Sequence, residues 1–235
     1  MGTEDAGTCQ RARHRSRRVR REGNLPGRAH PQLPDTHCGA ACRGEFFVLG
    51  APGRKGTAVM RVSLPLSPSV VSALRAGMEV RLHGRLYVAR DAAHRRFVEE
   101  IARGRPLPFD VEGEVIYYMG PTPAPAGMPI GACGPTTSSR MDRYTPPLLA
   151  KGLKGTIGKG RRSEEVRQAC RRFRAIYFIT YGGCGAFLST RVVRATPVAY
   201  PDLGPEQVLL LEVSDFPAIV GIDATGADFY ERAGG

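Results

Sequence analysis

From residue 60 onward, apolar runs typical of strands alternate with amphipathic runs typical of helices, and this alternation restricts the possible folds more than any other feature. The strand-like runs are 79–89, 114–119, 174–180, 207–213 and 217–223. Helices are predicted over 91–103 and 163–173, with Asp91 and Ser163 at their N-cap positions. Interleaved strands and helices of this size predict an α/β domain with a mixed sheet.

The residues before Met60 differ in composition from those after it. Residues 1–59 carry 11 Lys and Arg against 5 Asp and Glu, and three prolines interrupt 25–35. Because this segment lacks apolar periodicity, we expect a disordered leader, or one that is not translated because the true start is Met60. Its arginine content is also compatible with a transit peptide, although it lacks a clear amphipathic face. The sequence therefore predicts a basic leader (1–59) and one catalytic domain (60–235), which opens with a strand and a helix that starts at Ser67-Pro68.

Charge and hydropathy exclude two classes of partner. The net charge is +12, but residues 60–235 hold 23 basic against 17 acidic residues and no long basic stripe with interleaved aromatics, so nucleic acid is not an expected partner. No apolar run approaches the roughly 18 residues of a membrane span. We expect a soluble, cytoplasmic protein.

The cysteines do not form a metal or disulfide pattern. Cys38 and Cys42 are spaced C-x3-C without a second pair at zinc spacing, and Cys133 and Cys184 stand in glycine-rich turns. The six cysteines are Cys9, Cys38, Cys42, Cys133, Cys170 and Cys184. Neither a metal ligand nor a cofactor-binding residue is therefore predicted within this chain.

Three cations stand in glycine- or proline-rich segments where sites commonly lie. Arg90 ends the strand 79–89, Arg140 follows the hydroxyl-rich run GPTTSS, and Lys159 lies between two glycines in GTIGKG. An arginine can present its planar fork to a carboxylate through two parallel hydrogen bonds. The GTIGKG run does not have the spacing of a phosphate-binding Walker loop. His94 is interpreted as a hydrogen-bonded helix residue, and the residues by themselves indicate a small-anion-binding α/β domain.

Several longer segments resemble the β subunit of class I fumarate hydratases. They are ARDAAHRR, LPFDVEGEVIYYMGPTPAPAGMPIGACGPTTSSRMDRYTPPLL, GLKGTIGKG, YPDLGPEQV and DFPAIVGID. These fumarases belong to the iron–sulfur hydro-lyases, a group that also includes L(+)-tartrate dehydratase. The resemblance implies a swivelling β/β/α fold. It also implies a [4Fe-4S] cluster that three cysteines hold in a separate α subunit, and hence a hetero-oligomer.

The resemblance also implies a role for each candidate residue. Arg90, Arg140 and Lys159 would grip the two carboxylates of malate or fumarate. Thr136 would lie near the carbon that exchanges a proton, while the open iron of the cluster acts on the substrate hydroxyl. The expected function is reversible dehydration of (S)-malate to fumarate. An L(+)-tartrate dehydratase β subunit and a non-catalytic anion-binding or scaffold protein stay open as alternatives.

Overall fold

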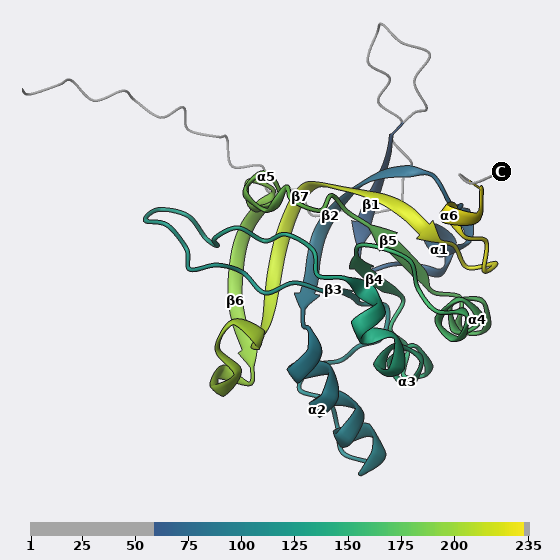
Figure 1. Ribbon diagram of the computed structural model, residues 1–235, viewed down its shortest axis with the longest axis horizontal. Coiled ribbons are helices and arrows are strands. Elements are labelled where there is room, and N and C mark those ends of the chain that lie inside the picture. The colour runs from purple at the N-terminus through teal and green to yellow at the C-terminus, as the bar shows by residue number, and fades with distance from the viewer. Residues whose placement is uncertain (1–58, 233–235) are drawn as a thin grey trace, which may run out of the picture. The chain divides into compact units, whose positions relative to one another are not determined.

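The computed structural model describes residues 59–232 (Figure 1). The predicted leader therefore lies outside the described residues, apart from Val59. The strands are β1 (Met60–Leu64), β2 (Glu79–Val88), β3 (Val115–Tyr117), β4 (Gly155–Gly158), β5 (Ile176–Ile179), β6 (Val192–Ala199) and β7 (Val208–Ile222). The helices are α1 (Pro68–Ala73), α2 (Asp91–Ala102), η1 (Ser138–Tyr144), α3 (Thr145–Ala150), α4 (Glu164–Phe173), α5 (Gly185–Ser189), η2 (Pro201–Glu206) and α6 (Phe229–Arg232).

The seven strands form one mixed sheet in the order β1-β2-β3-β4-β5-β7-β6. β1 to β5 run parallel to their neighbours, whereas β7 is antiparallel to β2, β5 and β6. The additional pairing of β2 with β7 joins β2, β3, β4, β5 and β7 into a closed, barrel-like ring of five strands. The predicted α/β class with a mixed sheet is confirmed, and the carboxyl ends of the parallel strands meet at one edge.

The two faces of the sheet carry separate apolar clusters, as the alternation of side chains along a strand requires. In β3, Val115 and Tyr117 belong to one cluster, together with Val71 of α1. Ile116 points to the other face, where Phe97 of α2 and the buried residues of α3 and α4 cover it. Figure 1 shows these three helices on the same side of the central strands. The short parallel strands β3, β4 and β5 thus lie between the interior of the ring and a layer of helices.

The helix starts agree with the sequence in two of three cases. Ser67 caps α1, because its Oγ accepts the Val70 N–H at 3.3 Å. Ser163 stands at the N-cap of α4, although its side chain makes no capping bond. The prediction that Asp91 caps α2 is wrong, because Arg90 occupies the N-cap and Asp91 is the first helical residue. The Asp91 carboxylate is instead bound by a guanidinium, which matters for the site described below.

Two predicted strands are one strand in the structure. Residues 214–216, which include the polar Ser214 and Asp215, separate the predicted runs 207–213 and 217–223, but β7 continues through them from Val208 to Ile222. Asp215 has φ of 52°, and the register against β2 shifts beside it. A bulge therefore accommodates the polar interruption, and the long strand can reach β2, β5 and β6 together.

Candidate active site

The GPTT segment lies across the carboxyl ends of β3 and β4. Pro135 bridges to Met119 just after β3, and the Thr136 N–H donates to the Tyr118 carbonyl at 2.7 Å. Two residues later, the Ser138 N–H donates to the Lys159 carbonyl at 2.9 Å. Backbone hydrogen bonds therefore bring Thr136 and Lys159, from separate segments of the chain, to the same edge of the sheet.

A glycine allows the hydroxyl-rich run to approach β4 closely. A Cβ placed on Gly158 would lie 2.0 Å from the Ser138 Oγ, so any larger residue would displace the segment. Ser138 is fully buried, and its Oγ accepts a hydrogen bond from the Tyr177 hydroxyl at 3.0 Å. The hydroxyls are therefore not equivalent, since Ser138 fixes the segment whereas the partly buried Thr136 remains near the surface.

A buried arginine anchors η1, the short helix that carries Arg140. The Arg162 side chain is 0% exposed, and its Nε donates to Asp142 Oδ1 at 2.6 Å. Its two terminal nitrogens donate to Thr145 at 2.7 Å and to Thr156 at 3.3 Å. The second Asp142 oxygen accepts the Ser163 N–H at 2.8 Å. Arg162 thus ties η1 and α3 to β4 and α4.

Arg140 and Arg90 are each held by a protein carboxylate. Arg140 donates from Nε to Asp91 Oδ1 at 3.0 Å, and its Nη2 lies 2.9 Å from Asp91 Oδ2 in an ion pair that lacks hydrogen-bond geometry. Arg90 donates from Nη2 to Glu206 at 2.7 Å, and the second Glu206 oxygen accepts the Ala92 N–H at 2.8 Å. A guanidinium has five N–H donors, so each arginine retains donors beyond these contacts.

Both arginines act on Glu206. Burial opposes the charge of this carboxylate, but hydrogen bonds from Arg90 and the Ala92 amide, with the charges of Arg90 and Arg140, hold the pKa of Glu206 below its ordinary value. The structure therefore brings Arg90 and Arg140 into one cluster of charges with Asp91 and Glu206. These two carboxylates were not predicted, because only the fold places residue 206 beside residue 90.

Arg90 also packs against the backbone that follows β3. A Cβ on Gly120 would lie 2.7 Å from an Arg90 terminal nitrogen and 3.1 Å from the Pro205 carbonyl. The absence of a side chain at residue 120 therefore leaves the space that the Arg90 guanidinium fills.

The buried His94 ring lies next to Arg90, with its Nδ1 at hydrogen-bond distance, 3.0 Å, from the Arg90 carbonyl oxygen. Burial lowers the pKa of His94 to about 4. The interpretation of His94 as a hydrogen-bonded helix residue is confirmed.

Lys159 differs from the two arginines. Within residues 59–232 its ammonium has neither an ion pair nor a hydrogen bond, and its side chain lies beside Gly182, where an added Cβ would be 3.4 Å from the Lys159 Cδ. Gly182 belongs to the turn after β5. Lys159 is therefore a cation available to an external anion at the carboxyl edge, although no contact links its side chain to Arg90 or Arg140.

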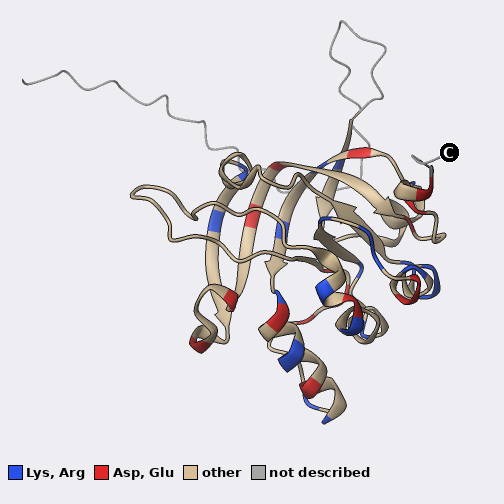
Figure 2. Cartoon of the chain, in the orientation of Figure 1, with Lys and Arg blue, Asp and Glu red and all other residues tan. Residues whose placement is uncertain are grey.

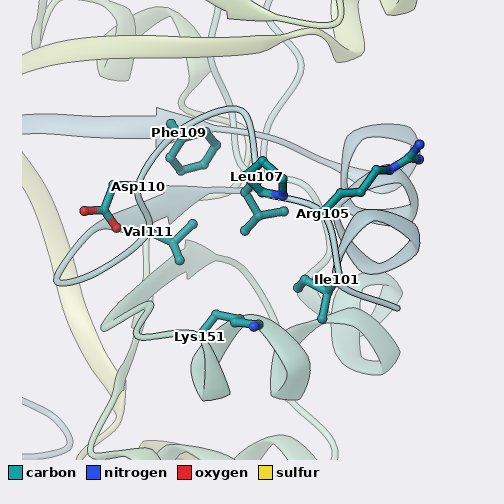
Figure 3. Close-up of a pocket in the computed structure, with 8 residues that line it drawn as sticks. Ile101, Arg105, Leu107, Phe109, Asp110, Val111 and Lys151 are labelled. Carbon is teal, nitrogen blue, oxygen red and sulfur yellow. The ribbon is translucent and has the colours of Figure 1, made fainter. Parts of the chain in front are cut away.

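Two hollows in the surface differ in their relation to these residues. One of about 210 Å³ lies at the arginine cluster and is lined by Asp91, Ala92, Arg95, Arg143, Tyr144 and Glu206. A second, of about 390 Å³, lies between the end of α2 and the segment before β3. Figure 3 shows its apolar side chains, Ile101, Leu107, Phe109 and Val111, with Lys151. None of the four predicted site residues lines either hollow, although Asp91 and Glu206, which bind Arg140 and Arg90, line the first.

The cysteines of the described residues do not fit an iron–sulfur cluster. Burial raises the pKa of Cys133 and of Cys170 to about 12, which opposes the thiolate form that iron requires, while Cys184 is exposed. Residues 59–232 contain no group of three His, Cys, Asp or Glu side chains placed to hold a metal ion. A cluster used by this protein would therefore need ligands from outside this part of the chain.

The fold and the site define an α/β domain that gathers cations and hydroxyls at the carboxyl ends of parallel strands. The chain belongs to the family described as Fumarase C-terminus, whose model matches residues 51–233. It is a member of the hydro-lyase family of class I fumarate hydratases and tartrate dehydratase β subunits. No helix among residues 59–232 is long and apolar enough to cross a membrane.

Relatives of two kinds match the chain. It is 40% identical over 158 residues to fumarate hydratase 2 of Leishmania major, and 40% identical over 153 residues to the anaerobic class I fumarate hydratase of Escherichia coli. These matches cover 66% and 64% of this chain but 28% of each relative. It is also 32% identical over 170 residues to the L(+)-tartrate dehydratase subunit beta of Escherichia coli, covering 70% of this chain and 83% of that subunit. That relative is, by its name, one subunit of its enzyme.

Proposed function

We propose that this chain is the carboxylate-binding part of a hydro-lyase that reversibly dehydrates (S)-malate to fumarate and water. The observation that carries the proposal is the position of three cationic side chains, which come from separate segments of the chain. Arg90 follows β2 and Lys159 follows β4, while Arg140 reaches the same edge on η1 after the GPTT segment. Three cations from separate segments at one edge of the sheet suit a small dianion better than they suit a scaffold, which would need no such arrangement.

The cations would bind and orient the substrate. Arg140 keeps one terminal nitrogen outside its contact with Asp91, and Arg90, whose Nε is buried, keeps one terminal nitrogen outside its contact with Glu206. A carboxylate can accept from these donors while the protein carboxylates hold the guanidinium planes in place. Fixing both carboxylates of malate restricts rotation of the carbon chain, so the C–H and C–OH bonds are held in a reactive arrangement.

Thr136 would serve at the carbon that exchanges a proton. Its N–H donates to the Tyr118 carbonyl, so the backbone that carries the hydroxyl is fixed at the edge of the sheet. A threonine hydroxyl is a weak base and needs a second group to carry the proton away. In this proposal that group and the [4Fe-4S] cluster belong to an α subunit, because the described cysteines do not fit a cluster.

The test uses the complex of this chain with its α subunit and compares Arg140→Lys with Arg172→Lys. Lysine keeps the charge but cannot form the two-point contact, so kcat/KM for malate should fall by about tenfold or more. Arg172 is exposed on α4, away from the site, and its replacement should leave the kinetics unchanged. Wild-type kinetics in Arg140→Lys would remove this arginine from the site.

L(+)-tartrate is the second candidate substrate, favoured by the match to a tartrate dehydratase β subunit over 83% of its length. Both substrates present two carboxylates, so the same cations serve either reaction. Rates of water loss from malate and tartrate, measured on one preparation of the complex, separate the two. A chain that binds these dianions but turns over neither with its α subunit would instead be a binding protein.

A further inference from the structure

The segment between β3 and η1 leaves the sheet and returns to it, forming an arm that we define as residues 120–134 (Figure 1). Its base is closed by the Thr122 N–H, which donates to the Ala132 carbonyl at 3.1 Å, and by the Ala132 N–H, which donates to the Thr122 hydroxyl at 2.8 Å. Every residue from 122 to 129 is exposed. The arm is therefore anchored at its base and open to solvent along its length.

The composition of the arm is unusual for an exposed segment. Residues 120–139 contain no Asp, Glu, Lys or Arg, although 24% of the chain is charged. Figure 2 shows the arm without a charged residue. Four of its residues are proline, which limits the conformations that the free arm can adopt. A partner that binds it would have less chain entropy to remove than with an ordinary loop.

A second uncharged segment packs against the base of the arm. Residues 175–190, which include α5, also lack charged side chains. The Cys133 N–H donates to the Gly185 carbonyl at 3.1 Å, which joins the two segments. Of the large hydrophobic residues exposed in the described part of the chain, half lie on these two segments: Met128 at 40%, Tyr181 at 40% and Phe187 at 44%. Exposed apolar groups concentrated in this way are typical of an interaction surface.

This surface adjoins the candidate active site. The arm runs directly into Pro135 and Thr136, and Lys159 lies beside Gly182 of the second segment. A chain docked here would reach the edge of the sheet where the cations gather. The fumarate hydratases that match this chain have most of their length outside the match, and the tartrate relative is one subunit of an enzyme.

We propose that the arm and the exposed side chains of 181–187 form the docking surface for the α subunit, with Met128 and Phe187 buried in the complex. The inference rests on the proposed function, which places the cluster and its ligands on that subunit. Because the arm is uncharged, it fits an apolar surface on the partner. Because the arm adjoins the candidate site, an α subunit bound to it would lie next to Thr136 and Lys159.

The experiment compares Met128→Asp and Phe187→Asp with Met78→Asp in the full chain, tagged and purified from its own organism. Met78 is 36% exposed and precedes β2 at its amino end, opposite the arm, so it matches Met128 in residue type and exposure. The co-purifying polypeptide is identified by mass, iron–sulfur absorbance and malate dehydration. Met128→Asp and Phe187→Asp should each reduce its recovery by about tenfold or more, and Met78→Asp should not. Circular dichroism checks that each variant is folded, and Met128→Asp alters only an exposed position.

The outcomes separate this inference from the function on which it rests. If the wild type co-purifies an active cluster-bearing subunit and both Met128→Asp and Phe187→Asp retain it, the docking surface is refuted while the proposed function stands. If no such subunit accompanies the wild type, the proposed function fails and the inference fails with it. If the purified chain self-associates, and Met128→Asp and Phe187→Asp abolish that self-association but leave binding of the α subunit intact, the surface is instead a contact between copies of this chain.

Discussion

Replacing Arg162 with methionine should cost the chain a large part of its stability. Arg162→Met removes the partner of Asp142, a carboxylate that is only 15% exposed, while it keeps a side chain of similar length. Breaking a buried ion pair by removing one partner typically costs about 3–5 kcal/mol. Asp142 keeps the Ser163 amide, and Thr145 keeps its bonds to Met141 and Tyr118, so the uncompensated groups are Asp142 and Thr156. We therefore expect a loss near the lower limit, about 3 kcal/mol.

Urea unfolding of the isolated chain, followed by circular dichroism, measures this loss as a fall in midpoint at constant slope. Arg161→Met is the control, because Arg161 is exposed and its replacement should change the stability by less than about 0.5 kcal/mol. Adding Asp142→Asn to Arg162→Met should restore part of the loss, since it removes the unpaired charge. A loss below about 1 kcal/mol in Arg162→Met would refute the reasoning, because it would equal that of an exposed ion pair.

Three other outcomes follow from the site. Glu206→Gln should remove a pH-dependent part of the stability. Because the pKa of Glu206 is lowered in the folded chain, its charge stabilises the fold at neutral pH, and this contribution is lost as the pH falls through the lowered pKa. Equal urea midpoint differences between wild type and variant at pH 7 and pH 3 would contradict it. Cys184 should react with iodoacetamide in the native chain, whereas the buried Cys133 should react only after unfolding, as peptide mapping can check; native labelling of Cys133 would disprove its burial. Asp91→Asn should raise the KM for malate by about threefold or more with unchanged stability, because it removes the carboxylate charge that holds the Arg140 guanidinium in place. An unchanged KM would show that Asp91 does not position Arg140.

The sequence predicts the elements with clear periodicity and misses those whose shape depends on neighbours. Helices 91–103 and 163–173 and strand 79–89 match α2, α4 and β2 to within one or two residues, because each has a regular apolar pattern. β4 was not among the predicted strands, because its residues fall in the glycine-rich segment GTIGKG, yet all four are buried. Gly158 is required by the close approach of Ser138, and Gly155 by that of Val115, and no local pattern records either contact.

The residues of the candidate site likewise divide into those that local sequence predicts and those that only the fold brings together. Arg90, Arg140 and Lys159 could be singled out because each stands beside a predicted turn, and Thr136 through the resemblance of its run to a family. Glu206 could not be predicted, because its carboxylate meets Arg90 only after β6 and η2 bring it to the start of α2. Arg162 likewise looks like one more surface arginine in GRRS, since its burial against Asp142 depends on how η1 folds back over β4.

The closure of the ring has a consequence for synthesis of the chain. Among the strands of residues 59–232, β7 is the last in chain order, yet it pairs with β2, β5 and β6. Until residues 208–222 have left the ribosome, β2 and β5 each keep an edge with unpaired backbone groups, and such edges can pair with other chains. A premature stop codon after β6 would therefore do more than remove one strand, because it would leave an open sheet that is prone to aggregate.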